Sequence, residues 1–224
     1  MPSALGTHQL NDVADLLGSY PDLDLSTAVA LIRSARAYQA GLWVAEDDPE
    51  YAWLKFVSAV ETAADHWWQG QADPAEHLEA WDQGLFERLQ QAGGAELVDY
   101  AAEKLVQVTR STRKFLDFLD AFKPPPPESR PEPAMQVDWS KLRHGLSQIY
   151  GYRSKSLHGG KAFPGPLLDG PIRYPNTEER PLGLAAAVGQ SVWKAEDLPM
   201  YLHIFEHIAR RALLTWWAAS SESR

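Results

Sequence analysis

The sequence Ile149-Tyr150-Gly151-Tyr152-Arg153-Ser154-Lys155-Ser156-Leu157-His158-Gly159-Gly160 places an arginine and a histidine five positions apart, where a predicted helix ends at two glycines. It lies within residues 139–168, which hold five basic residues and no acid. The whole chain, by contrast, has a formal net charge of -9. A cationic segment in an anionic chain predicts an anionic substrate or partner.

Composition predicts a folded protein with a substantial core. The chain has 224 residues, of which 45% are hydrophobic and nine are tryptophan, and we expect a single domain over residues 1–224. The chain contains no cysteine, which excludes disulfides, thiolate metal sites and a cysteine nucleophile. Residues 1–17 do not resemble a signal peptide, and no apolar run approaches the roughly 20 residues of a membrane helix. We therefore expect a cytoplasmic protein that does not contact a membrane.

Hydrophobic periodicity predicts an all-α fold. The clearest apolar stripe lies in residues 50–71 and consists of Trp53, Phe56, Val57, Val60, Ala64 and Trp67. A second stripe, in the helix that Asp24 or Ser26 caps, consists of Ala28, Leu31, Ile32, Ala35 and Tyr38 or Gln39. The remaining predicted helices span residues 1–23 (weakly), 75–91, 95–122, 138–157 and 195–220. We expect a helical bundle.

Two segments rich in proline and glycine interrupt this pattern. Residues 123–134 contain six prolines and predict a stiff linker or surface loop, with a spacer favoured over a docking sequence. Residues 159–189 predict a long irregular loop before the last helix, and loops of this length are often functional. The only β-like run is residues 188–193.

The Arg153 and His158 pair has the chemistry of metal-free RNA cleavage. The histidine can move a proton at the 2′-hydroxyl or the 5′-oxygen, and the arginine can stabilise charge on the phosphate oxygens. Five positions of ideal helix separate two side chains by roughly 140°. They converge on one phosphate only if the helix end distorts or if two copies of the helix meet across a dimer axis. Spacing alone favours the alternative of a surface arginine and a helix-terminal histidine.

Residues 152–159 resemble the R-x4-6-H motif of the HEPN superfamily, and most closely its Apea-like branch. In that branch a tyrosine, Arg-Ser, a basic residue, His and Gly run together. Residues 35–38 and residues 56–61, which end in Glu61, resemble earlier helices of the same branch. Residues 160–166 and 193–217 resemble bacterial members that carry a proline-rich loop behind the motif. The resemblance covers residues 28–217 loosely and residues 149–166 sharply.

This resemblance implies a HEPN-like helical bundle and a metal-independent endoribonuclease that needs no cofactor. It implies RNA as substrate, a homodimer with the motif at the interface, a role as a toxin or antiviral-defence effector, and an antitoxin or defence partner protein. His158 would be the general acid or base and Arg153 the phosphate ligand. The orienting groups would be Ser154 and Glu61, and the RNA contacts Tyr152, Lys155 and Lys161.

Several alternatives stay open. Ser154 stands where active members commonly carry Asn, Asp or His, which favours a non-catalytic HEPN module that binds nucleic acid, a nucleotide or a partner protein. A third alternative is a helical dimerisation protein in which the Arg–His pair only caps a helix. Glu61 suits a structural ion pair as well as a site-supporting role. His203 and His207 lie one helical turn apart, but no third ligand is indicated, so we expect no metal site.

Overall fold

The computed structural model describes residues 11–68, 73–169, 178–181, 185–188 and 191–222. Within these ranges one antiparallel pair of short strands, β1 (Ala185–Val188) and β2 (Ser191–Lys194), is the only sheet. All other long elements are helices, which confirms the all-α class. They are α1 (Asn11–Ser19), α2 (Leu25–Val44), α3 (Pro49–Trp67), α4 (Pro74–Trp81), α5 (Gln83–Ala121), α6 (Leu142–Gly159), α7 (Gly165–Leu168) and α8 (Leu202–Glu222).

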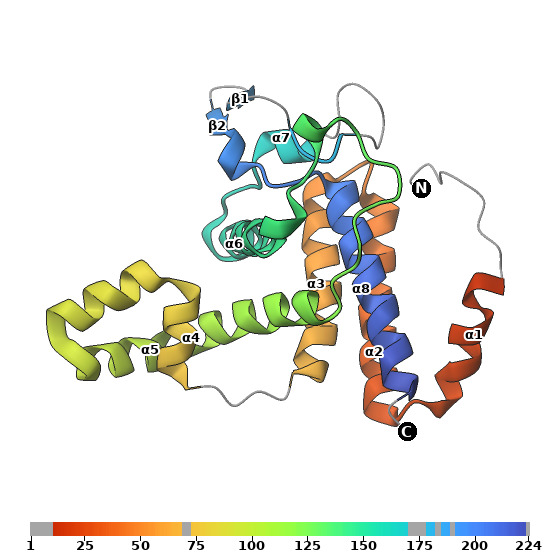
Figure 1. The fold of residues 1–224 in the computed structure, drawn as a ribbon, viewed down its shortest axis with the longest axis horizontal. Coiled ribbons are helices and arrows are strands. Elements are labelled where there is room, and N and C mark those ends of the chain that lie inside the picture. Colours follow the sequence, from red (N-terminus) through yellow and green to blue (C-terminus); the bar gives the residue numbers. More distant parts are fainter. Residues whose placement is uncertain (1–10, 69–72, 170–177, 182–184, 189–190, 223–224) are drawn as a thin grey trace.

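Helix α3 is the centre of the core. It lies beside α2 and α8 in a bundle, and α6 crosses this bundle at a steep angle (Figure 1). The stripe predicted for this helix is buried, except that Trp67 is half-buried. The ring of Trp53 stacks on Phe163 and Phe205 at centroid distances of 5.6 and 5.2 Å, and its Nε1 donates to the Leu167 carbonyl. Burial of such rings is the largest source of stability in a core.

Helix α2 turns a different face to the core than its largest apolar residues predict. Leu31 is buried as expected, but Ile32 is 41% exposed and Ala35 is exposed. Small residues lie against α3 instead, and at Gly41 an added Cβ would lie 2.7 Å from the Phe56 ring. Close approach of two helices requires small side chains at the contact, and this requirement overrides the hydrophobic pattern.

An arm formed by α4 and the first part of α5 projects from the bundle (Figure 1). The predicted helix over residues 75–91 is wrong in its extent, because α4 ends at Trp81 and Asp82 caps α5 by accepting a hydrogen bond from the Leu85 amide. The break predicted between the helices over residues 75–91 and 95–122 appears as a kink inside α5. Gly94 has φ 63° and ψ -159°, a conformation that a residue with a Cβ adopts only under strain.

Hydrogen bonds hold the proline-rich segment over residues 123–134 against later parts of the chain. Trp139 Nε1 donates to the Pro124 carbonyl at 3.0 Å, and Lys123 Nζ donates to the Trp139 carbonyl at 2.8 Å. Arg130 forms two hydrogen bonds with the buried carboxylate of Glu179 at 2.7 and 2.6 Å. These contacts favour the surface-loop interpretation of the segment over that of a free linker.

The loop predicted over residues 159–189 is partly regular. Helix α7 and strand β1 lie inside it, whereas residues 170–177 and 182–184 lie outside the described residues. Within the β-like run predicted over residues 188–193, Val188 ends β1 and residues 191–193 lie in β2, whereas residues 189–190 lie outside the described residues.

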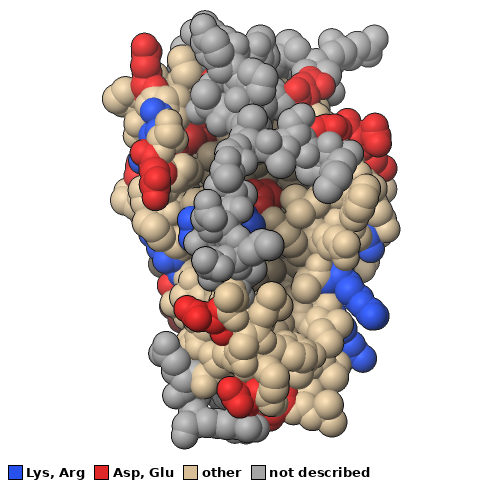
Figure 2. Space-filling view, turned by 90° about the vertical axis from the view of Figure 1, so that its right-hand side faces the viewer, with Lys and Arg blue, Asp and Glu red and all other residues tan. Residues whose placement is uncertain are grey.

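The face of the molecule on the side of α1 and α8 carries few basic residues. Figure 2 shows lysine and arginine side chains mainly toward its edges and a broad uncharged area in its lower half. The motif of residues 153–158 belongs to α6, which lies on the other side of the bundle in Figure 1.

Candidate functional site

Helix α6 carries the Arg–His motif and is regular over its whole length. It follows a 3-10 turn (Trp139–Lys141) that Asp138 caps through the Ser140 amide. The helix continues through His158 to Gly159, and the following residue, Gly160, adopts the left-handed conformation with φ 59°. The amides of Gly160 and Lys161 both donate to the Lys155 carbonyl. A glycine at this position allows the chain to leave the helix without strain.

Arg153 is held by two groups on one side of its guanidinium. Its Nη2 donates to Glu61 Oε2 at 2.6 Å, and the Tyr150 hydroxyl donates to Glu61 Oε1 at 2.8 Å. The guanidinium carbon lies 5.6 Å from the centre of the Tyr150 ring. The side chains of Arg153 and Glu61 are each 19% exposed. The structure thus brings Arg153 and Glu61 together, with a tyrosine that the sequence analysis did not select.

Burial sets the electrostatics of this cluster. Burial raises the pKa of Glu61 above its ordinary value, and the Arg153 charge and the Tyr150 hydrogen bond act in the opposite direction. Burial and the Glu61 charge also raise the pKa of Tyr150. Tyr150 therefore remains a hydrogen-bond donor to the carboxylate at neutral pH.

A small hollow borders this cluster. Glu61 and Asp65 line it from α3, and Ser111 and Lys114 line it from α5. Lys114 Nζ lies 2.7 Å from Asp65 Oδ1, so a salt bridge between α3 and α5 lines the hollow together with Glu61.

His158 does not join Arg153 within one chain. Its side chain is exposed in the last turn of α6, whereas Arg153 lies against α3. The helix end is not distorted before Gly160, so the roughly 140° between the two side chains remains. Arg153 and His158 could reach one phosphate through a distorted helix end or through the meeting of two chains. The structure excludes the distorted helix end, so only the meeting of two chains remains.

The other predicted site residues have different surroundings. Ser154 is half-buried and makes no hydrogen bond to any described residue. Tyr152 donates to the Asp197 carbonyl at 2.6 Å, and burial raises its pKa to about 12. Lys155 is exposed, with its Nζ 5.8 Å from the Tyr152 ring centre, and Lys161 is exposed beyond the helix. The two lysines are accessible to a ligand, whereas the hydroxyl of Tyr152 is already bound.

A second acid of α3 fixes the same helix. Glu50 Oε1 accepts hydrogen bonds from the Ser156 hydroxyl at 2.9 Å and from the Phe163 amide at 3.1 Å. Glu50 and Glu61 are eleven residues apart, which places them on one face of α3, and their partners Arg153 and Ser156 are three apart on α6. The two spacings differ, about 16 Å along α3 and about 4.5 Å along α6, so no signal in the sequence predicts this pairing.

No family model, curated protein or solved structure that was compared with this chain matches it. The resemblance to the HEPN superfamily therefore rests on the sequence of the motif and its neighbouring helices.

None of the helices in the described part of the chain has the length and apolar character that crossing a membrane requires.

Proposed function

We propose that this chain is a metal-independent endoribonuclease of HEPN type that acts as a homodimer, as a toxin or antiviral-defence effector. The observation that carries the proposal is the Glu61–Tyr150–Arg153 cluster. It orients the guanidinium of Arg153 through Nη2, and the Nε group makes no hydrogen bond within the described part of the chain. A guanidinium that is oriented before substrate binds is well suited to a phosphate.

The proposed reaction needs two proton transfers and one cationic side chain that binds the phosphate. The 2′-hydroxyl of the RNA loses its proton to a base and attacks the adjacent phosphorus, and the bond from phosphorus to the 5′-oxygen breaks. The products are a 2′,3′-cyclic phosphate and a 5′-hydroxyl, which takes up a proton from an acid. His158 of the partner subunit serves as acid or base, while Arg153 stabilises the charge on the non-bridging oxygens. Lys155 and Lys161 contact the RNA backbone.

The dimer is part of the proposal, because Arg153 and His158 diverge on α6. A two-fold axis beside this helix would bring His158 of the partner subunit toward Arg153, and it would build two equivalent sites. Both sites lie in the basic segment of residues 139–168, which suits a polyanionic substrate.

The direct test is cleavage of a mixed RNA pool in the presence of EDTA. We expect wild-type protein to cut and the His158→Ala and Arg153→Gln variants to lose about 100-fold or more in rate. His144→Ala is the matched control, because His144 is also an exposed histidine of α6, and it should cut like wild type. Equal cutting by wild type and His158→Ala would refute the assignment.

A mixing experiment tests the shared site separately. Inactive Arg153→Gln and His158→Ala chains are mixed and allowed to exchange subunits. Half of the dimers are then mixed, and one of the two sites in each mixed dimer is intact, so about a quarter of wild-type activity returns. If both residues act in the same chain, no mixed dimer has an intact site and no activity returns.

The ion pair itself favours a second candidate function, a non-catalytic HEPN module. Glu61 neutralises Arg153, and Ser154 adds neither charge nor a base. This candidate predicts RNA or nucleotide binding that Lys155→Ala and Arg153→Gln weaken, without cleavage by the wild-type protein under any metal-free condition.

A further inference from the structure

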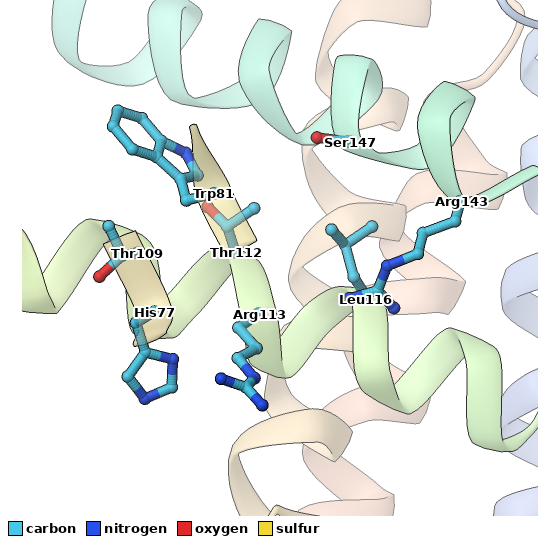
Figure 3. Close-up of a pocket in the computed structure, with 8 residues that line it drawn as sticks. All are labelled: His77, Trp81, Thr109, Thr112, Arg113, Leu116, Arg143 and Ser147. Atoms are coloured by element: carbon cyan, nitrogen blue, oxygen red, sulfur yellow. The ribbon is translucent and has the colours of Figure 1, made fainter. Parts of the chain in front are cut away.

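The hollow where α4, α5 and α6 meet does not bring its side chains to one point. Figure 3 shows the rings of His77 and Trp81, both from α4, pointing away from each other. Arg113 and Arg143 of the same hollow both pair with Asp117, at 3.3 and 3.0 Å. These groups are therefore not arranged around a common ligand, and the strongest unpartnered feature of the described residues is instead a face of α2.

Helix α2 carries a stripe of exposed side chains along its length, which we call the α2 seam. Its members recur at alternating intervals of four and three residues, the spacing of a coiled coil, and an ideal helix places them within about 80° of one another. They are Leu25, Val29, Ile32, Arg36, Gln39 and Trp43. The four apolar members are 81%, 40%, 41% and 55% exposed, in chain order.

The face of α2 opposite the seam is buried in the bundle, where α2 packs against α3. Asp24 caps the helix by accepting hydrogen bonds from the amides of Ser26 and Thr27 at 2.8 and 3.0 Å. The backbone that carries the seam is therefore ordered before any partner binds, which lowers the entropic cost of association.

The exposure of large apolar side chains is concentrated on this seam. Of the nine large apolar or aromatic side chains that are exposed among the described residues, four belong to it. Single exposed apolar residues are ordinary, but a continuous apolar stripe on a folded protein marks a surface that another molecule covers. The spacing of the seam suits one helix, whose side chains would enter between successive turns of α2.

The charges along α2 define the chemistry of that helix. Arg36 lies on the seam and Arg33 beside it, and both are exposed without an ion pair to any described residue. Helix α2 itself contains no acid, whereas exposed acids stand before it at residues 22 and 24 and after it at residues 46–48. From one end to the other, the surface is thus acidic, basic and acidic again.

A second copy of this chain does not suit the seam. Two α2 helices paired in full register, in either orientation, would place the basic centre on the basic centre and the acidic ends on the acidic ends. Like charges that face each other across an interface cost free energy. The complementary partner has the opposite order of charges, which is basic, acidic and basic. Because this order is the same from either end, such a helix fits in both orientations.

We propose that the α2 seam binds an amphipathic helix of another protein, whose apolar stripe lies on the seam and whose central acidic residues pair with Arg33 and Arg36. Basic residues of this helix lie toward both of its ends, next to the acids that flank α2. The seam belongs to α2 and the proposed ribonuclease residues belong to α6, so this docking does not depend on cleavage.

The test uses two synthetic helical peptides of about 20 residues, the length of α2. The first carries leucine at the a and d positions of its heptads, two glutamates beside the stripe at its centre and one lysine toward each end. The second exchanges its glutamates and lysines with each other in number and place, so that it has two central lysines and one glutamate toward each end. Fluorescence anisotropy with the full-length protein at low ionic strength should give a Kd about tenfold lower for the first peptide. The reason is that the charges that attract the first peptide repel the second.

Variants of the seam locate the binding. The double variant Arg33→Glu/Arg36→Glu should reverse the preference, so that the second peptide binds more tightly. Ile32→Asp should raise the Kd of both peptides about tenfold, since it places a charge in the apolar stripe. Arg88→Glu is the matched control, because Arg88 is also an exposed helical arginine without an ion pair in the described ranges, and it should keep the wild-type preference. The His158→Ala variant should bind both peptides like wild type, so a failure of the proposed ribonuclease does not affect this result.

Absence of binding of either peptide at about 1 mM, or an equal Kd of the two peptides for wild-type protein, would overturn the proposal. A lower molar mass of Ile32→Asp than of wild type in multi-angle light scattering would overturn it as well, because a second copy would then cover the seam.

Discussion

Removal of the charge on Glu61 should destabilise the folded protein strongly, because it leaves a guanidinium in a largely buried position without its partner. The Glu61→Gln change keeps an acceptor for the Tyr150 hydroxyl but removes the ion pair to Arg153 at 2.6 Å. Breaking a fully buried pair costs roughly 3–5 kcal/mol. Each of these side chains retains 19% exposure, so water recovers part of the loss, and we expect a decrease of about 2–3 kcal/mol in the free energy of unfolding.

A double-mutant cycle measured by urea unfolding at pH 7 isolates the interaction. We expect Glu61→Gln, Arg153→Met and the double variant to give a coupling energy of about 1–2 kcal/mol. The control is the Lys194–Glu196 pair, in which both side chains are 73% exposed, and it should give less than about 0.5 kcal/mol. A coupling no larger than that of the control would refute the view that Glu61 holds Arg153 in place.

Three further predictions concern the fold. Gly41→Ala should lower the free energy of unfolding by about 1–3 kcal/mol, since the new methyl group meets an aromatic ring of α3. Gly151→Ala should raise it by about 0.5–1 kcal/mol, because nothing lies within 4 Å of the added Cβ. Thermal unfolding measures both changes. Burial lowers the pKa of His203 from 6.5 to about 4, so the unfolded chain binds the proton more readily and stability is lost as pH falls from about 6.5 toward 4. His203 should contribute about 3 kcal/mol to this loss in urea titrations at several pH values, and His203→Gln should remove that contribution. The lowered pKa values of His77 and His207 leave a smaller dependence of the same sign. Arg130→Met should cost about 3–5 kcal/mol in urea unfolding, because the Glu179 side chain is 2% exposed and loses its countercharge, and a change below 1 kcal/mol would contradict this account.

The sequence predicted the helical class and the core face of α3 because both depend on local periodicity. It did not predict the face of α2, since the contact at Gly41 depends on how closely a second helix approaches. It also did not predict that α4 ends at Trp81, because the Asp82 cap competes with a continuous helical pattern. Signals within one helix were sufficient to predict the helices themselves. Contacts beyond a single helical pattern determined the buried face of α2 and the end of α4.

In the candidate site, too, the sequence predicted the residues but not the contacts between helices. The sequence selected Arg153, His158 and Glu61 from a resemblance, and helical geometry predicted that the first two diverge. The contact between Glu61 and Arg153 and the participation of Tyr150 depend on the crossing of α3 and α6, which no single segment encodes.

The paired attachment of α6 to α3 has a geometric consequence for any symmetric assembly of this protein. Glu61 fixes Arg153, and Glu50 fixes Ser156 one turn later, so α6 can neither rotate nor slide along α3 without breaking both attachments. In a dimer with a two-fold axis, α6 of each subunit is displaced in the opposite direction perpendicular to the axis. The distance between the two copies of α6 therefore changes by twice the displacement in one subunit. Reactive groups that two chains contribute to one site must lie well within 1 Å of their working positions. Glu50 and Glu61 would therefore determine how accurately the interface places these groups, although neither carboxylate touches it.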